Sequence, residues 1–333
     1  MNHLLEVSEL EQRFDVSPGF FDCLKIRNGR LKYQKSIVHA VNGVSFQIDP
    51  GEVFGLVGES GCGKSTIAKT IIKLYEPAGG RIKINGEDIP SYDYKKMMPV
   101  RKMIQMIFQD PYASLNPRLK VMDIVTEPMA LKGAAYGKTE MREKAMELLK
   151  RVGLGAEHVN RYPHQFSGGQ RQRIGIARAL SVEPELVIAD EPVSALDVSI
   201  QAQILNLMMD LKDEFGFSYL FITHDLSVVR HISDRIGVMY LGFLVETGPS
   251  DEVFLNPRHP YTQALLSAAP SVDEKLHIEP LDIRGEVPTA LELPTGCSFQ
   301  TRCPFAFDRC AGERPWLISR VPGRMEACHL LDA

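Results

Sequence analysis

Nine consecutive residues have the types and spacing needed to bind a polyphosphate. They fit the pattern G-x-x-x-x-G-K-[ST] and are Gly58, Glu59, Ser60, Gly61, Cys62, Gly63, Lys64, Ser65 and Thr66. The glycines let backbone N–H groups turn inward, and a following helix adds the partial positive charge of its N-terminus. Lys64 would then reach the β- and γ-phosphates, and the Ser65 hydroxyl would hold Mg²⁺. The alternative, a chance glycine-rich turn, is disfavoured because an apolar strand pattern precedes the run and a helical pattern follows it.

Polar side chains at the ends of other apolar runs could complete a hydrolytic site. Asp190 and Glu191 close the run 186–189, where Asp190 would orient Mg²⁺ and Glu191 would orient or deprotonate the attacking water. Gln109 ends another run and could contact Mg²⁺ and the water, although an ordinary polar strand end is the simpler alternative. His224 follows a third run, where an imidazole can donate to a γ-phosphate or be merely structural.

A second phosphate-directed element lies at 167–170. Ser167, Gly168, Gly169 and Gln170 open a helical pattern, so their amides and the helix dipole predict another anion site. One chain has one nucleotide to bind. The element is therefore predicted to complete the site of another copy.

The elements that must position these residues alternate between strand and helix. Strands are predicted at 4–10, 44–48, 81–84, 102–108, 186–190, 219–223, 235–240 and 243–247, and helices at 66–75, 121–131, 138–152, 167–180 and 198–215. Residues 15–36 are interpreted as a loop, and 270–296 as a linker or extended segment. The pattern predicts an α/β fold with a largely parallel sheet covered on both faces and a helical insertion.

Composition limits the classes of function. A length of 333 residues suggests two domains, and 44% hydrophobic with 24% charged residues is typical of a globular protein. The formal net charge of −4 argues against a general electrostatic grip on nucleic acid. Without a signal peptide or a membrane-spanning apolar run, the chain is expected to stay in the cytoplasm and to reach a membrane only through a partner.

The order of these motifs, with Ser194-Ala195-Leu196-Asp197 and Ile222-Thr223-His224-Asp225, resembles the nucleotide-binding subunit of an ABC transporter. The resemblance covers roughly residues 4–250 and implies a P-loop NTPase fold, with an ABC ATP-binding domain at 1–248 and a helical subdomain at about 112–180. It implies ATP and Mg²⁺, with head-to-tail pairing of two subunits. The residues expected to act in cis are Gly58 to Thr66, Gln109, Asp190, Glu191 and His224. Those expected to act in trans are Ser167, Gly169 and Gln170, with Asp197 at the dimer seam. Phe14 and Tyr33 compete as the residue that stacks on adenine.

The last part of the chain concentrates cysteines. Cys297, Cys303, Cys310 and Cys328 have spacings of C-x5-C-x6-C-x17-C, without the close knuckles of common zinc sites. A reducing cytoplasm disfavours disulfides, so a metal site is preferred over unliganded thiols. The spacing does not distinguish a Zn²⁺ site from an iron–sulfur cluster, and His329 is a possible substitute ligand.

Residues 256–262, 296–299 and 302–304 resemble the C-terminal extension of oligopeptide and dipeptide ABC importers, and 110–117 resembles the F-type ATPase of those systems. The resemblance implies that 249–333 form a C-terminal extension whose four cysteines hold a structural [4Fe–4S] cluster. His259 and Tyr261 are interpreted as packing or helix-start residues.

The expected partners are a second ABC ATPase subunit (a sister chain or an identical copy), two integral membrane permease subunits and, through them, an extracytoplasmic substrate-binding protein. The protein would lie on the cytoplasmic face of the membrane and power peptide uptake. Import of nickel or another small nutrient is the nearest alternative, followed by an ABC ATPase not devoted to transport. The single set of motifs disfavours the latter.

Overall fold

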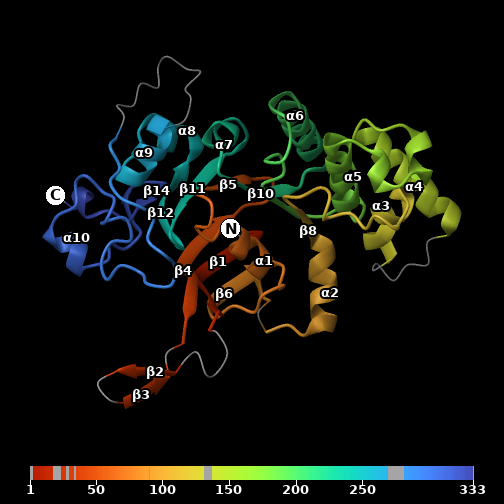
Figure 1. Ribbon diagram of the computed structural model, residues 1–333. Coiled ribbons are helices and arrows are strands. Elements are labelled where there is room, and N and C mark those ends of the chain that lie inside the picture. The colour runs from red at the N-terminus through yellow and green to blue at the C-terminus, as the bar shows by residue number, and fades with distance from the viewer. Residues whose placement is uncertain are drawn as a thin grey trace.

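A computed structural model describes residues 3–17, 24–27, 30–33, 35–89, 91–130, 137–268 and 281–332 (Figure 1). Its centre is an eight-stranded mixed sheet in the order β13-β14-β12-β11-β5-β10-β9-β8. An antiparallel sheet lies below it in the view of Figure 1. The helices α3 to α5 lie at one end, and the C-terminal region (residues 250–268 and 281–332) lies at the other end.

Five adjacent strands of the central sheet run parallel to one another. They are β8 (Ile104–Ile107), β9 (Leu186–Asp190), β10 (Ser218–Thr223), β5 (Val53–Val57) and β11 (Arg235–Tyr240). The apolar runs predicted as strands form them because both faces are buried. The remaining strands, β12 (Phe243–Pro249), β14 (Arg324–Glu326) and β13 (Ile318–Val321), extend the sheet in antiparallel fashion. The C-terminal residues are therefore part of the main sheet.

The second sheet is antiparallel and has the order β4-β1-β6-β7. Its strands are β1 (Leu5–Asp15), β4 (Ile37–Ile48), β6 (Gly79–Ile84) and β7 (Glu87–Asp88). The prediction of a loop over 15–36 was wrong in part, because β2 (Leu24–Arg27) and β3 (Arg30–Tyr33) pair as a hairpin within it. Strands β1, β4 and β6 were recognised in part from their own patterns, as 4–10, 44–48 and 81–84. Strands β2, β3 and β7, and the pairing that makes a separate sheet, were not predicted.

Alternate side chains of the parallel strands enter two hydrophobic cores. In β10, Tyr219 and Phe221 face the core shared with the helical region, while Leu220 and Ile222 face the core shared with α1 and the antiparallel sheet. This period of two explains why the sheet is buried on both faces, as predicted, although strands rather than helices cover much of one face.

The helices preceding the helical region are α1 (Lys64–Ile71) and α2 (Tyr94–Met103). The first was predicted to reach residue 75, but Lys73 adopts a φ of +56°, a left-handed conformation that ends it early. The second was missed, so residues 102 and 103, predicted as the start of a strand, belong to α2 instead. Asp93 starts α2 by accepting a hydrogen bond from the Lys96 N–H at 2.8 Å.

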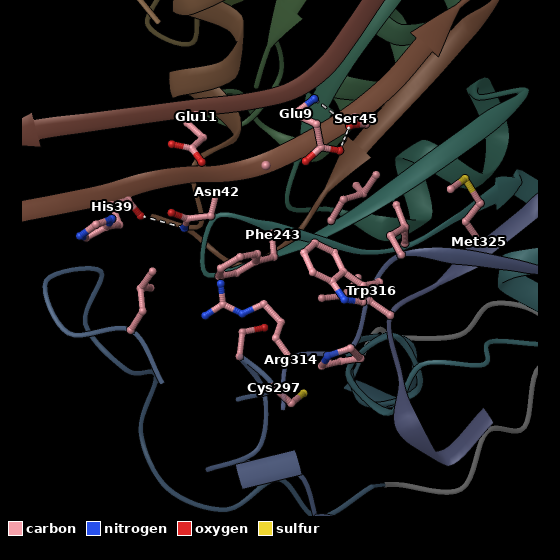
Figure 2. Close-up of a pocket in the computed structure, with 18 of the residues that line it drawn as sticks. Glu9, Glu11, His39, Asn42, Ser45, Phe243, Cys297, Arg314, Trp316 and Met325 are labelled. Atoms are coloured by element: carbon pink, nitrogen blue, oxygen red, sulfur yellow. Dashed lines mark hydrogen bonds between the residues drawn. The ribbon is translucent and has the colours of Figure 1, made fainter. Parts of the chain in front are cut away.

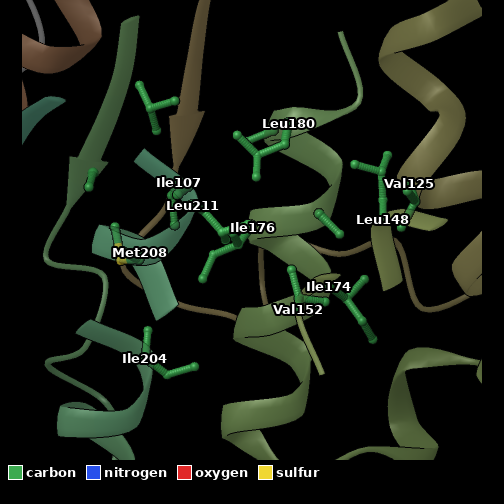
Figure 3. Close-up of a cluster of buried hydrophobic side chains, with 14 of the residues drawn as sticks. Ile107, Val125, Leu148, Val152, Ile174, Ile176, Leu180, Ile204, Met208 and Leu211 are labelled. Atoms are coloured by element: carbon green, nitrogen blue, oxygen red, sulfur yellow. The ribbon is translucent and has the colours of Figure 1, made fainter. Parts of the chain in front are cut away.

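The helical region contains α3 (Val121–Ala130), α4 (Lys138–Arg151), two short 3-10 turns (Ala156–Asn160 and Pro163–Gln165) and α5 (Gly168–Leu180), and α6 (Val198–Phe215) packs beside it. The predicted apolar stripe on α4 is confirmed, since Ala145, Leu148, Leu149 and Val152 are at most 1% exposed. Figure 3 shows these helices meeting around Ile174, Ile176 and Met208.

The remaining helices are α7 (Leu226–Ile232), α8 (Ser250–Leu255), α9 (Pro260–Ala268) and α10 (Asp308–Gly312), followed by a 3-10 turn at His329–Leu331. In the described part of the chain, no helix combines the length and apolar character needed to cross a membrane.

Candidate nucleotide site

The predicted phosphate loop connects the end of β5 to the start of α1. Gly58 and Gly63 have φ angles of +155° and +109°. A Cβ at Gly58 would lie 2.2 Å from the Met239 carbonyl oxygen, and one at Gly63 would lie 2.2 Å from that of Ala40. Because both obstacles are backbone atoms, only glycine fits at these two positions.

Lys64 directs its ammonium back over this loop. Its Nζ donates to the carbonyl oxygens of Gly58 at 2.7 Å and Glu59 at 3.0 Å. Its third contact is to the Cys62 sulfur at 3.7 Å, a weak acceptor that a phosphate oxygen would readily replace. The side chain is only 4% exposed, so its charge is held at the loop. The group is therefore suited to bind an anion there.

Ser65 and Asp190 meet across the sheet. The Ser65 hydroxyl donates to Asp190 Oδ1 at 2.7 Å, although 125 positions separate the two residues. The contact forms because β9 and β5 both pair with β10 and end at the same edge of the sheet. Burial raises the pKa of the Asp190 carboxyl. A hydroxyl and a carboxylate at this separation fit Mg²⁺, which takes few protein ligands and fills its shell with water and phosphate.

Two other predicted residues contact the Glu191 carboxylate. Gln109 Nε2 donates to Glu191 Oε2 at 2.9 Å, and His224 Nδ1 lies 3.3 Å from Glu191 Oε1. Glu191 itself adopts a φ of +46°, a strained conformation for a non-glycine residue, and its N–H donates to the Ile222 carbonyl at 2.8 Å. The strand end thereby turns the carboxylate toward the phosphate loop.

These residues line one open cavity of about 770 Å³. Its wall includes Gly58, Glu59 and Ser60 from the loop and Gln109, Glu191 and His224 from the strand ends. The cavity brings a phosphate-binding backbone and a candidate general base to the same space, which is the arrangement needed for attack of water on a phosphoanhydride.

The element at 167–170 lies outside this cavity. Ser167 caps α5, since its Oγ accepts from the Gln170 N–H at 3.4 Å and the Gln170 side chain accepts from the Ser167 N–H at 3.1 Å. A Cβ at Gly169 would lie 2.6 Å from Ile200 Cγ2. Ser167 is exposed, and so is Asp197 at the start of α6. Neither residues 167–170 nor Asp197 line the cavity of their own chain.

The two candidates for adenine stacking differ in what the structure describes. Phe14 packs edge-on against Tyr75, with ring centroids 5.0 Å apart. The side chain of Tyr33 lies outside the described residues. The choice between them stays a prediction.

A second cavity of about 530 Å³ separates the antiparallel sheet from the C-terminal region (Figure 2). The Arg314 guanidinium lies 4.2 Å from the centre of the Phe243 ring, and Trp316 is 73% exposed beside it. Its polar wall is internally bonded, since Asn42 donates to the His39 carbonyl and Ser45 to Glu9. No predicted catalytic residue lines it.

The four C-terminal cysteines do converge. Cys297, Cys303, Cys310 and Cys328 line one small cavity together with His259 and His329. Burial raises the pKa of Cys297, Cys303 and Cys328 to about 11 each, so these thiols are neutral at pH 7. However, no group of three or more His, Cys, Asp or Glu within the described ranges has the arrangement needed to hold a metal ion. The [4Fe–4S] prediction is therefore not supported by the geometry, and neither is the zinc alternative.

Sequence reasoning missed two residues of the C-terminal region that contact the phosphate loop. The Tyr261 hydroxyl accepts a hydrogen bond from the Glu59 N–H at 3.0 Å, and Arg302 forms an ion pair with the Glu59 carboxylate at 2.9 Å. Tyr261 is buried as predicted but does more than pack. No local pattern could have shown either contact, because 202 and 243 positions separate the partners.

A phosphate loop between a parallel strand and a helix, with two carboxylates at a neighbouring strand end, defines a P-loop nucleoside-triphosphatase. Comparison with known proteins agrees. Residues 41–194 match the family model described as ABC transporter, and residues 245–310 match the one described as Oligopeptide/dipeptide transporter, C-terminal region.

Similar proteins span nearly the whole chain. The oligopeptide transport ATP-binding protein AppF of Bacillus subtilis (strain 168) is 53% identical over 308 residues, which are 92% of this chain and 93% of the relative. The dipeptide transport ATP-binding protein DppF of Escherichia coli (strain K12) is 47% identical over 329 residues, covering 99% of this chain and 95% of the relative. Among solved structures, a dimeric post-hydrolysis state of the ATP-binding cassette MJ0796 bound to ADP and Pi is 29% identical, with a TM-score of 0.63 over 74% of this chain and 98% of that one. The chain belongs to the family of ABC transporter ATP-binding subunits, and its activity is ATP hydrolysis.

Proposed function

We propose that this chain is an ATP-hydrolysing subunit that powers the import of oligopeptides or dipeptides. The observation that carries the proposal is the near-complete coverage of relatives named for transport of those cargoes, together with the match of residues 245–310 to their C-terminal region. The partners would be a second ATPase subunit, two membrane permeases and a substrate-binding protein. The chain would then work on the cytoplasmic face of the membrane.

The cis residues divide the chemistry among them. The backbone of Gly58 to Thr66 and the Lys64 ammonium would hold the triphosphate. Ser65, Asp190 and Gln109 would hold Mg²⁺, which would supply positive charge to neutralise the phosphates. Glu191 orients the attacking water and accepts its proton. The support for this role is that Gln109 and His224 fix both of its carboxylate oxygens.

The trans residues would serve the partner subunit. Ser167, Gly169 and Gln170 would bring the N-terminus of α5 to the γ-phosphate held by the partner, with Asp197 at the seam. Supporting this are the exposure of Ser167 and its position outside the cavity of its own chain.

Replacement of Glu191 tests the catalytic part of the proposal. Glu191→Gln keeps the shape and a hydrogen-bonding oxygen but removes the base. ATP binding should therefore persist, while turnover should fall by about 10²- to 10⁴-fold. Phosphate release and equilibrium ATP binding measure the two effects. The matched control is Glu185→Gln, since Glu185 is exposed and bonds Asn85 far from the loop. Hydrolysis at the parent rate in Glu191→Gln would remove the assigned role.

The cargo is tested in the assembled transporter. Co-purified permeases and ATPase subunits should show ATPase stimulation by a binding protein loaded with a di- or oligopeptide. Stimulation by a nickel-loaded binding protein and not by a peptide-loaded one would replace peptides by the metal as cargo.

We further propose that Cys297, Cys303, Cys310 and Cys328 hold a [4Fe–4S] cluster with a structural role. The support is that the four thiols line one small cavity, although their arrangement in the described residues is not that of a formed metal site. Loading must displace the thiol protons, so uptake of iron should weaken as the pH falls. Anaerobic purification with iron, sulfide and zinc analysis decides the matter. Stoichiometric zinc without iron contradicts the cluster.

A further inference from the structure

The carboxylate of Glu59, the second residue of the phosphate loop, forms an ion pair with Arg302 of the C-terminal region. Arg302 Nη1 donates to Glu59 Oε2 at 2.9 Å and to Oε1 at 3.2 Å, and Nη2 donates to Oε1 at 3.2 Å. Arg302 is only 9% exposed. A forked guanidinium–carboxylate contact of this kind is both stronger and more directional than a simple surface ion pair.

The backbone of the same residue is held as well. The Glu59 N–H donates to the Tyr261 hydroxyl at 3.0 Å, and its carbonyl accepts from Lys64 Nζ at 3.0 Å. Tyr261 is itself immobilised, since it is fully buried with its ring 4.7 Å from that of Tyr240 and 5.4 Å from that of Phe299. All three polar groups of Glu59 therefore have partners, and two of the partners come from the C-terminal region.

The negative charge of Glu59 matters for nucleotide binding because of where the residue lies. The residue lines the 770 Å³ cavity between Gly58 and Ser60, so a carboxylate stands beside the space for a triphosphate. An unpaired negative charge there would repel the phosphates. The Arg302 guanidinium pairs with this carboxylate and neutralises its charge.

We infer that Arg302 and Tyr261 are positioning residues for nucleotide binding: they fix Glu59 of the phosphate loop, and Arg302 neutralises its charge. The C-terminal region thus sets the affinity for ATP through one residue. The inference rests on the proposed role of residues 58–66 in holding the triphosphate.

The test is equilibrium binding of ATP with Mg²⁺ to the purified full-length chain and its variants. Arg302→Gln should weaken binding about tenfold, since it removes charge-assisted bonds and exposes the phosphates to Glu59. The matched control is Arg309→Gln, in the same region, where Arg309 pairs with Glu313 and Asp332 instead. It should stay within about twofold of the parent.

Two further readouts and one further variant distinguish a positioning role from a general effect on the folded structure. The double variant Glu59→Gln with Arg302→Gln should regain affinity to within about threefold of the parent, because the repelling charge is gone. The defect of Arg302→Gln should also shrink with added salt, which screens repulsion. Tyr261→Phe, which loses only the acceptor for the Glu59 N–H, should weaken binding about threefold.

Melting temperatures of all variants confirm that each is folded. Parental affinity in Arg302→Gln, or a double variant as weak as Arg302→Gln alone, would overturn the inference while leaving the nucleotide site in place. A parent chain that binds no ATP would overturn both the inference and the proposed function.

Discussion

Arg324 lies at the centre of a buried charge cluster that attaches the C-terminal region to the main sheet. It is 3% exposed, and its two acidic neighbours, Glu246 on β12 and Glu326 on β14, are fully buried. Arg324 Nη2 donates to Glu246 Oε1 at 2.6 Å and to the Asn256 carbonyl at 2.9 Å, and its Nε lies 3.9 Å from Glu326 Oε1. Arg324→Met keeps most of the side-chain volume but removes this charge.

The expected cost follows from what remains around the two carboxylates. Glu326 keeps Arg258, whose Nη1 donates to Glu326 Oε1 at 3.0 Å. Among the described residues, Glu246 then keeps the backbone N–H groups of Arg258 and His259, at 3.0 Å each, but no ion pair with a cation. Leaving one carboxylate buried and uncompensated costs about 3–5 kcal/mol of unfolding free energy. At about 2.1 cal/mol/K of unfolding entropy per residue, a chain of 333 residues should melt about 4–7 °C lower.

Urea and thermal unfolding of the full chain measure this loss. Arg309→Met is the control, because Arg309 is exposed and its ion pairs should contribute less than about 1 kcal/mol. Adding Glu246→Gln to Arg324→Met should recover part of the stability, since it removes the stranded charge. A loss below about 1 kcal/mol in Arg324→Met, or a double variant no more stable than the single one, would refute the reasoning.

Two more predictions concern the loop and the strand before it. Gly63→Ala places a Cβ 2.2 Å from the Ala40 carbonyl oxygen, whereas Gly61→Ala, at φ +80°, meets no atom within 4 Å. Both should lose about 1–2 kcal/mol to backbone strain, and Gly63→Ala should lose a further ~1–3 kcal/mol and bind ATP at least tenfold more weakly, as melting and binding assays will show. Burial raises the pKa of Glu52 despite its contact with Arg235, so the folded state favours its protonated form more than the unfolded chain does. The free energy that Glu52 contributes to stability is present below its unfolded pKa and is lost as the pH rises through its folded pKa. Glu52→Gln should therefore flatten the decline of melting temperature as the pH rises above about 4.5.

The sequence allowed the local parts of the fold and site to be predicted. The strand, loop and helix around Gly58 to Thr66 are contiguous, so a local pattern contains them. The helix α6 was predicted with the bounds Val198–Phe215 that the structure has, and it ends at Gly216 in the left-handed conformation. The helix start at 167–170 is likewise a pattern of four adjacent residues. The structure adds a cap there, in which Ser167 and Gln170 exchange hydrogen bonds.

What the sequence could not provide is the pairing of distant segments. The antiparallel sheet joins Leu5 to both Ile48 and Ile84, and β12 pairs Glu246 with Glu326. Such registers depend on which buried faces fit together in three dimensions rather than on any pattern within one strand. The same reason hid the contacts of Tyr261 and Arg302 with Glu59. Tyr261 was interpreted as a packing or helix-start residue, and Arg302 was given no role of its own.

The C-terminal region contacts the nucleotide site through the central sheet and through two side chains. It supplies β14 as the neighbour of β12, whose partner β11 lies directly beside β5 and the loop that follows it. It also supplies the partners of the Glu59 N–H and carboxylate. If these residues were removed, β12 would lose one of its two neighbouring strands, and the Glu59 carboxylate beside the nucleotide cavity would lose its guanidinium. A change of packing around Tyr261 or Arg302 must then alter the loop, because an interior packed this tightly transmits small displacements to its neighbours. The affinity for ATP is in this way a property of the whole chain and not of residues 58–66 alone.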